Sequence, residues 1–115
     1  MSSAAGTAAG LVFEGVAGEG RYRLLGDMSF DTAIPALRQA EPLFRGGMPL
    51  VFDLAGVTRA DSAGVGLLIE WLRLARQAGC PLHYANLPEP LRAMVRVCGI
   101  ADMLPLETPP PFLPD

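Results

Sequence analysis

The sequence has few side chains that bind metal ions or form disulfides. Its 115 residues include two cysteines, Cys80 and Cys98, and one histidine, His83. The cysteines are 18 positions apart with no CxxC pair, and together with the histidine they fall short of a full tetrahedral zinc set. We therefore expect no metal site and no cofactor, and interpret the cysteines as two small buried thiols.

Basic surface and long apolar runs are also scarce. Nine Lys and Arg residues face twelve Asp and Glu residues, for a net charge of −3, so the chain lacks the positive surface that nucleic acids or anionic lipids attract. Glu70 and Arg73 interrupt the most apolar stretch, residues 65–74, and a membrane span needs about 20 apolar residues. Residues 1–10 lack the apolar segment of a secretion signal. These features predict a cytoplasmic protein that neither binds nucleic acid nor inserts into a membrane.

Catalytic motifs are missing as well. The sequence contains no GxxxxGK[ST] phosphate loop, no GxSxG elbow and no Cys–His arrangement of recognisable spacing. Asp53 and Asp61 resemble a carboxylate pair, but we expect the first to end a strand and the second to frame a helix start. We predict that the protein is not an enzyme. Phosphate binding at the helix start near Ser62 stays open as a lesser alternative.

The hydrophobic pattern predicts one domain over residues 11–106, between an unstructured segment at 1–10 and a proline-rich tail at 107–115. A hairpin of two short strands comes first, and helices and strands then alternate. The expected elements are strands at 11–14 and 21–25, a helix from Asp31 or Thr32 to about Phe44, a strand at 50–54, a loop at 56–61, a helix at 63–78 capped by Ser62, a strand at 81–86, a helix from Pro88 to Val97 and a short strand or turn at 100–106.

Alternation of strands and helices calls for parallel strands joined by helical crossovers. The fold class is therefore α/β: a mixed β-sheet of four to five strands, with an N-terminal hairpin and helices packed on the sheet.

The most informative segment is Asp61-Ser62-Ala63-Gly64, which lies between a buried strand and the strongest helix. Ser62 is expected to accept a hydrogen bond from the first turn, and Asp61 lies where the helix dipole favours negative charge. Gly64 and Gly66 keep that turn bare, at a cost of roughly 1 kcal/mol each in helix stability. The two glycines indicate either contact with another molecule or close packing of the helix on the sheet.

The helix at 63–78 is apolar over more than half of its circumference. One sheet face needs a stripe of only about 100°, so neighbouring helices or a partner protein must cover the rest. Leu67 and Leu74 flank the polar side and are our candidates for the partner side, with coverage by another helix as the alternative. Trp71 is predicted to lie in the core.

The pattern D-[ST]-x-G after a V-x-D strand resembles the STAS family of sulfate transporter and anti-sigma factor antagonist domains, and the resemblance covers residues 11–106. The run from Asp53 to Gly64, together with Leu67-Leu68 and residues 74–79, is most similar to the MlaB branch. This resemblance implies a non-catalytic subunit of an Mla-type phospholipid ABC transporter. It implies that Ser62, framed by Asp61 and Gly64, faces an MlaF-like ATPase subunit in an inner-membrane complex with permease and MCE subunits.

The other branch of the family, the anti-sigma factor antagonists, supplies the alternative function. These proteins bind a serine kinase and resemble D-S-[ST]-G, with the phosphorylated residue directly before the glycine. Ala63 occupies that position here and has no hydroxyl group. The usual phosphorylation switch is therefore not expected, although phosphorylation of Ser62 stays open.

Overall fold

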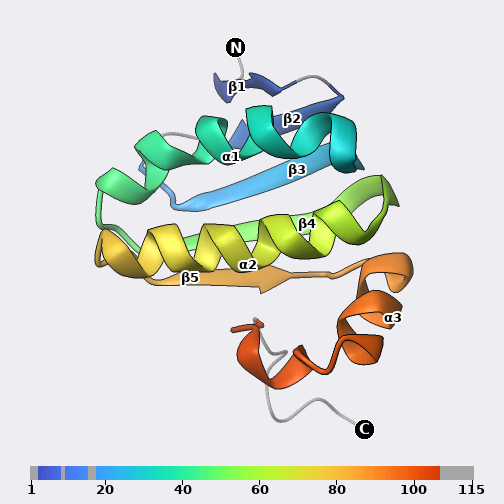
Figure 1. Ribbon diagram of the computed structural model, residues 1–115. Helices are drawn as coiled ribbons and strands as arrows, with labels where there is room; N and C mark the ends of the chain where they lie inside the picture. The colour runs from blue at the N-terminus through green and yellow to red at the C-terminus, as the bar shows by residue number, and fades with distance from the viewer. Residues whose placement is uncertain (1–2, 9, 16–17, 107–115) are drawn as a thin grey trace, which may run out of the picture.

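A five-stranded mixed β-sheet organises the computed structural model, which describes residues 3–8, 10–15 and 18–106 (Figure 1). Strand order follows chain order, with antiparallel pairing from β1 to β3 and parallel pairing from β3 to β5. The elements are β1 (Ser3–Ala8), β2 (Leu11–Gly15), β3 (Arg21–Met28), α1 (Phe30–Arg45), β4 (Leu50–Ala60), α2 (Ser62–Gln77), β5 (Leu82–Ala85), α3 (Glu89–Val97) and a 3-10 turn (Ala101–Met103). The predicted fold class is confirmed.

The N-terminal residues Ser3–Ala8 form an edge strand of the sheet. Strand β1 pairs with β2 where the sequence predicts an unstructured segment, so that prediction is wrong for residues 3–8. The segment is rich in small residues and has no strong apolar alternation, but the edge of β2 offers its backbone hydrogen-bond partners. The predicted proline-rich tail, residues 107–115, lies outside the described residues.

Strand β4 is longer than the sequence predicts. A β-bulge interrupts the alternation of apolar and polar residues, so the second half of the strand does not show the expected pattern. Leu50, Phe52 and Leu54 face the core in alternation, and the next core residue is Val57. The pairing with β3 shifts by one residue between Asp53 and Gly56, so the side chains of β4 change face there. The predicted loop at 56–61 is therefore mostly strand.

Both long helices begin earlier than predicted. Helix α1 has Ser29 as its N-cap, and the backbone N–H of Ser29 donates to Oγ1 of Thr32, 2.9 Å away. The first helix therefore starts neither at Asp31 nor at Thr32. Pro42 does not end α1, which continues to Arg45.

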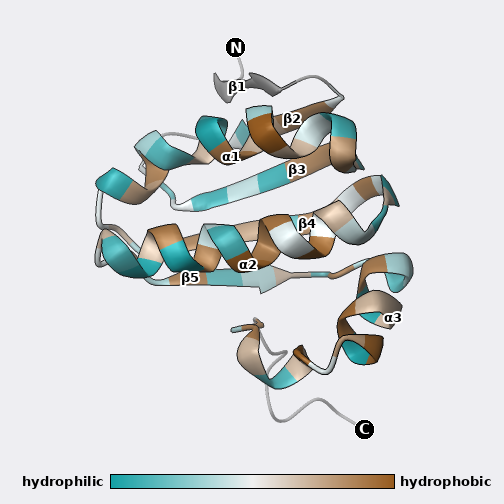
Figure 2. Ribbon diagram, viewed as in Figure 1, coloured by the Kyte–Doolittle hydropathy of each residue, from teal (hydrophilic) through white to brown (hydrophobic). Residues whose placement is uncertain are grey.

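The core lies between the sheet and the two helices α1 and α2, which run side by side across one face (Figure 1). Phe52 of β4 is at its centre, with its ring 5.7 Å from Phe13, 6.0 Å from Phe44 and 5.1 Å from Trp71. Trp71 is fully buried, as predicted. Along both helices the hydrophobic residues alternate with hydrophilic ones, as expected for helices with one buried face (Figure 2).

The opposite face of the sheet carries charged side chains, among them Arg21 of β3 and Asp53 of β4. Asp53 accepts hydrogen bonds from the Asn86 side chain and the Ala55 N–H, both at 3.0 Å, and Arg21 lies 3.4 Å away. Burial alone raises the pKa of Asp53, but these three donors outweigh it and hold the pKa below its ordinary value of 3.8. The ionised carboxylate therefore stabilises the sheet.

A lowered pKa in the folded state means that this stabilisation is complete above the unfolded pKa and is lost as the pH falls through the folded pKa. At pH 6, Asp53→Asn should lower the free energy of unfolding by roughly 1 kcal/mol. The difference from the parent protein should shrink as the pH falls below about 4. Urea unfolding at a series of pH values measures both, with the exposed Asp102→Asn as control. A deficit that did not depend on pH would contradict the role given to the charge.

Candidate functional site

The parallel strands bring the starts of α1 and α2 to the same edge of the sheet. Strands β3 and β4 end together, with Met28 paired to Ala60, and each chain turns directly into a helix. The N-termini of both helices are therefore neighbours (Figure 1). This edge holds the motif that the sequence singles out.

One carboxylate joins the two helix starts. Asp61 is the N-cap of α2, and its Oδ1 accepts a hydrogen bond from the Ala63 N–H at 2.8 Å. Its Oδ2 accepts from the N–H of Phe30, the first residue of α1, at 3.1 Å. The backbone N–H of Asp61 in turn donates to the Met28 carbonyl at 3.2 Å. Asp61 thus satisfies an unpaired N–H on each helix and places negative charge at both positive helix ends.

Ser62 is not the cap that the sequence predicts. It is the first helical residue of α2 and is exposed, because Asp61 already occupies the capping position. Ala63, which follows it, is half-buried. The hydroxyl of Ser62 is therefore presented to the outside on a short, exposed turn.

The two glycines of this turn have different roles. Gly64 is buried, and a Cβ built there would lie 2.8 Å from the Met28 carbonyl oxygen. Gly64 therefore lets α2 pack closely on the end of β3, which was the alternative to partner contact. Gly66 is exposed, and a Cβ there would meet nothing within 4 Å. No packing of the described residues requires a glycine at 66.

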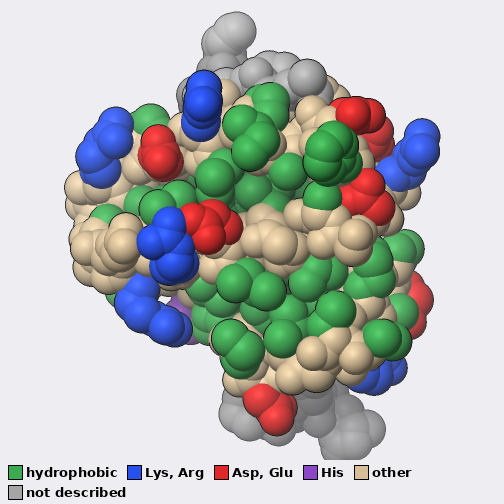
Figure 3. Space-filling view, in the orientation of Figure 1, with side chains coloured by type: hydrophobic (Ala, Val, Ile, Leu, Met, Phe, Trp, Pro, Cys, Tyr) green, Lys and Arg blue, Asp and Glu red, His purple; other side chains and the backbone are tan. Residues whose placement is uncertain are grey.

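Exposed apolar side chains adjoin this turn on both helices. On α1, Phe30 is 80% exposed and Ile34, one turn later, is 58% exposed. On α2, Ile69 is 37% exposed and lies about two turns after Ser62. Figure 3, which looks onto the helices, shows hydrophobic side chains at the surface over both of them. We call Phe30, Ile34, Ser62, Gly66 and Ile69 the N-terminal helix face.

The sequence did not reveal the α1 half of this face. The helix predicted from Asp31 or Thr32 to about Phe44 includes Ile34 but leaves Phe30 outside the helix. The available signal was the spacing of four residues between Phe30 and Ile34, which puts both on one side of a helix that begins at Phe30. Whether that side faces the core depends on how the helix sits on the sheet.

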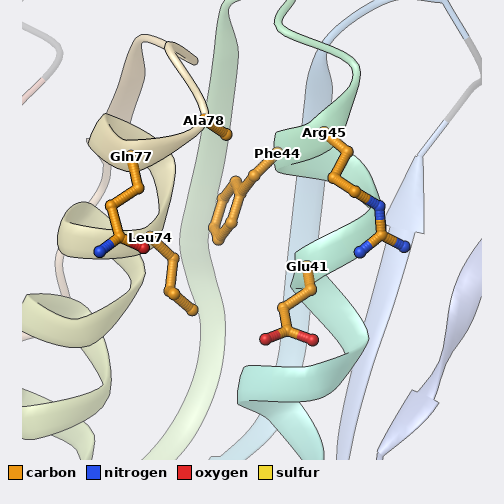
Figure 4. A pocket seen from close by; sticks show the side chains of 6 residues that line it. All are labelled: Glu41, Phe44, Arg45, Leu74, Gln77 and Ala78. Atoms are coloured by element: carbon orange, nitrogen blue, oxygen red, sulfur yellow. The ribbon is translucent and has the colours of Figure 1, made fainter.

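Leu67 and Leu74 were the two leucines predicted to face a partner, and the prediction is wrong for Leu67. It is 4% exposed and belongs to the core, so a neighbouring element covers it, as the alternative stated. Leu74 is half-buried and lies 12 residues after Ser62, about 18 Å along the helix. With Phe44 it lines a hollow of about 280 Å³ at the C-terminal ends of α1 and α2, and its side chain extends into the space between the two helices (Figure 4). Leu74 is thus separate from Asp61, Ser62, Ala63 and Gly64, which do lie together.

The two aspartates considered as a pair are also far apart. Asp53 and Asp61 are eight positions apart along or just beyond β4, roughly 25 Å at the rise of a strand. Within the described residues, no three His, Cys, Asp or Glu side chains cluster as metal ligands would.

The two cysteines differ in exposure. Cys80 is buried, whereas Cys98 is exposed, so the interpretation of two buried thiols is wrong for Cys98. None of the helices described has the length and apolar character of a membrane span.

Three solved structures share this architecture and are distant from the chain in sequence. A Thermotoga maritima protein assigned as an anti-sigma factor antagonist has a TM-score of 0.65 at 13% identity, over 84% of this chain and 85% of its own. The anti-sigma factor antagonist SpoIIAA in its unphosphorylated form gives 0.61 at 13% identity, over 88% and 90%. An anti-sigma factor antagonist from Mycobacterium paratuberculosis gives 0.55 at 23% identity, over 86% and 85%. Comparison with curated protein sequences gives no significant match.

The mixed sheet, the two helices on one face and the Asp61–Gly64 turn define an α/β domain of the STAS type. The family model described as "Mlab, STAS domain" matches residues 13–106. The chain therefore belongs to this STAS_2 family, and the resemblance seen in the sequence is confirmed at that level.

The contrast between the glycines predicts opposite changes in stability. Gly64→Ala should lower the free energy of unfolding by about 1–3 kcal/mol, because its methyl group would press on the Met28 carbonyl. Gly66→Ala should raise it by about 1 kcal/mol, because alanine favours the helix and meets no obstacle. Urea unfolding of the two variants tests this directly. Equal changes in both would mean that Gly64 does not serve packing.

Proposed function

We propose that this chain is the STAS subunit of an Mla-type phospholipid ABC transporter and that it binds the ATPase subunit through the N-terminal helix face. The observation that carries the proposal is the exposed Ser62 beside Gly66, a glycine that no described neighbour requires. Membership of the Mlab STAS family supports the choice of partner. The proposed complex lies at the cytoplasmic side of the inner membrane, with permease and MCE subunits, and serves outer-membrane lipid asymmetry.

The physical basis of binding is close approach to a bare helix turn. A helical glycine costs about 1 kcal/mol relative to alanine, which a contact with another backbone can offset. Phe30 and Ile34 add apolar surface whose burial is worth roughly 25 cal/mol per Å². Asp61 holds α1 and α2 together at this edge, so both halves of the face are presented as one rigid surface.

The proposed role involves no chemistry on the STAS subunit itself. The face has exposed apolar groups and one hydroxyl, Ser62, with the carboxylate of Asp61 engaged by two backbone N–H groups. Such a surface suits protein contact, and we infer that it stabilises or positions the ATPase.

An anti-sigma factor antagonist is the second candidate, because the solved structures of this fold carry that name. Their sequence identity of 13–23% supports the fold alone. Ala63, half-buried and without a hydroxyl, occupies the position where that branch carries its phosphorylated residue. This observation favours the transporter subunit.

The first test is capture of the tagged chain from native cytosol and detergent-solubilised membranes, read by mass spectrometry. We expect an ABC ATPase together with its permease. Recovery of a serine kinase without transporter subunits would instead establish the signalling function.

Binding to the purified ATPase then tests the surface. Ser62→Leu and Gly66→Gln on α2 and Phe30→Ser on α1 should each weaken binding at least tenfold, about 1.4 kcal/mol. Their free energies of unfolding should change by less than about 0.5 kcal/mol, apart from a small gain at Gly66. Val97→Ser is the matched control, because Val97 is also apolar, 87% exposed and on α3, outside the face.

Affinity unchanged in all three variants would disprove the assigned surface while leaving the captured partner valid. Leu67→Asp is unsuitable for this purpose: it would bury a charge in the core and unfold the domain.

A further inference from the structure

Helix α1 carries two prolines on its outer side. Pro35 and Pro42 lie inside the helix and both are exposed, so neither ring fills the core. Because α1 begins at Phe30, Pro35 is in its second turn, past the first positions where a helix tolerates proline at little cost. The two prolines are two helical turns apart and therefore lie on the same side of α1. Figure 1 shows α1 at the front of the molecule, with this outer side turned away from the sheet.

Each proline leaves one backbone carbonyl of α1 without its helical partner. Proline has no N–H group, so the carbonyl four residues earlier receives no hydrogen bond from it. These carbonyls belong to Asp31 and Arg38, which are both exposed residues. The proline ring also crowds the same carbonyl, which turns outward as a result. Helix α1 thus presents two backbone acceptors on its outer side, about 10 Å apart along the helix.

The two acceptors differ in the charge beside them. The Asp31 carbonyl lies next to the Asp31 carboxylate, which makes no ion pair with any described residue. The second carbonyl belongs to Arg38, whose own guanidinium repels a cationic donor. Hydrogen bonds with an ionised partner are roughly twice as strong as neutral ones. The acceptor at Asp31 therefore suits a positively charged donor, and the acceptor at Arg38 does not.

The acceptor at Asp31 adjoins the N-terminal helix face without belonging to it. Asp31 directly follows Phe30, whose side chain is 80% exposed. Pro35 directly follows Ile34, which is 58% exposed. A partner that covers these two apolar side chains brings its own donors within reach of the Asp31 carbonyl. The carbonyl of Arg38 lies two turns further along α1, away from this edge of the sheet.

We propose that the first two turns of α1 bind a basic side chain, arginine or lysine, of the ATPase subunit. Its N–H groups donate to the carbonyl of Asp31, and its charge pairs with the Asp31 carboxylate. Pro35 is a positioning residue, because it keeps the carbonyl open without touching the basic side chain. This inference rests on the proposed function, since it names the chemistry of one contact that the ATPase makes at this edge.

Replacing each proline by alanine separates binding from stability. In Pro35→Ala the new backbone N–H can donate to the Asp31 carbonyl and complete the helix. The urea midpoint should therefore rise, while the affinity for the purified ATPase falls about tenfold. Pro42→Ala is the matched control, because Pro42 is also exposed and on the same side of α1. It should raise the urea midpoint as well and leave the affinity unchanged.

The variant Asp31→Asn tests the charge of the bound group. Its affinity for the ATPase should be about threefold lower than that of the parent chain at low salt. Added salt should weaken binding of the variant less than binding of the parent chain, because salt screens the ion pair. Asp102→Asn is the control, since it removes an exposed carboxylate outside α1 and should bind like the parent chain.

Three results would overturn the inference. If Pro35→Ala binds the ATPase as tightly as the parent chain, the Asp31 carbonyl is not a contact. If Pro42→Ala loses as much affinity as Pro35→Ala, the loss comes from the shape of α1 and not from one carbonyl. If the affinity of Asp31→Asn depends on salt as steeply as that of the parent chain, the bound group is not a basic side chain. An ATPase that does not bind even the parent chain would contradict the proposed function, and this inference with it.

Discussion

The parallel pairing of β3, β4 and β5 is the constraint on which the functional edge depends. Parallel neighbours need a crossover, and here both crossovers are helices on the same face of the sheet. Each helix must then begin where a strand ends, at one common edge. The register of Met28 with Ala60 brings the two turns together, and the Asp61 carboxylate lies between them. A single side chain can join two helix starts only because the strands already end at the same level.

The N-terminal helix face combines tight internal packing with an open exterior. Gly64 brings α2 against the end of β3, so the turn is held from beneath by the Met28 carbonyl and by the capping bonds of Asp61. Two residues later, on the outer side of the helix, Gly66 leaves the surface bare. A surface built this way loses little entropy on binding, because its backbone is already ordered. The hollow at Leu74 differs from this face in both respects. It lies at the far ends of the helices, and long exposed side chains such as Glu41 and Arg45 line it.

Much of the architecture follows from local patterns, and the exceptions have identifiable physical causes. Two strong local signals are the apolar run at 50–54 and the apolar periodicity after Asp61. The structure has β4 at the first and α2 at the second. The second half of β4 could not be predicted from local pattern, because a bulge after Leu54 reverses which residues of the strand face the core. The helix starts were misplaced by one to three residues because Ser, Asp and Thr are all competent caps, and the tertiary position of the preceding strand decides among them. The exposure of Leu67 was predicted wrongly because α2 is apolar on several sides, and its sequence does not indicate which side packs against the neighbouring elements.

The amino-acid sequence by itself determined the alternation of strands and helices, the motif Asp61–Gly64 and the absence of a hydroxyl at Ala63, since all three are properties of residue order and type. The tertiary structure alone decided that Asp61 rather than Ser62 caps α2, that Gly64 packs while Gly66 stays open, and that Phe30 and Ile34 are exposed beside Ser62. Each of these depends on a contact between residues about 30 positions apart or on the side of a helix that meets the sheet. Such contacts exist only once β3 and β4 are paired in register, because that pairing sets where each helix begins and which of its sides is covered.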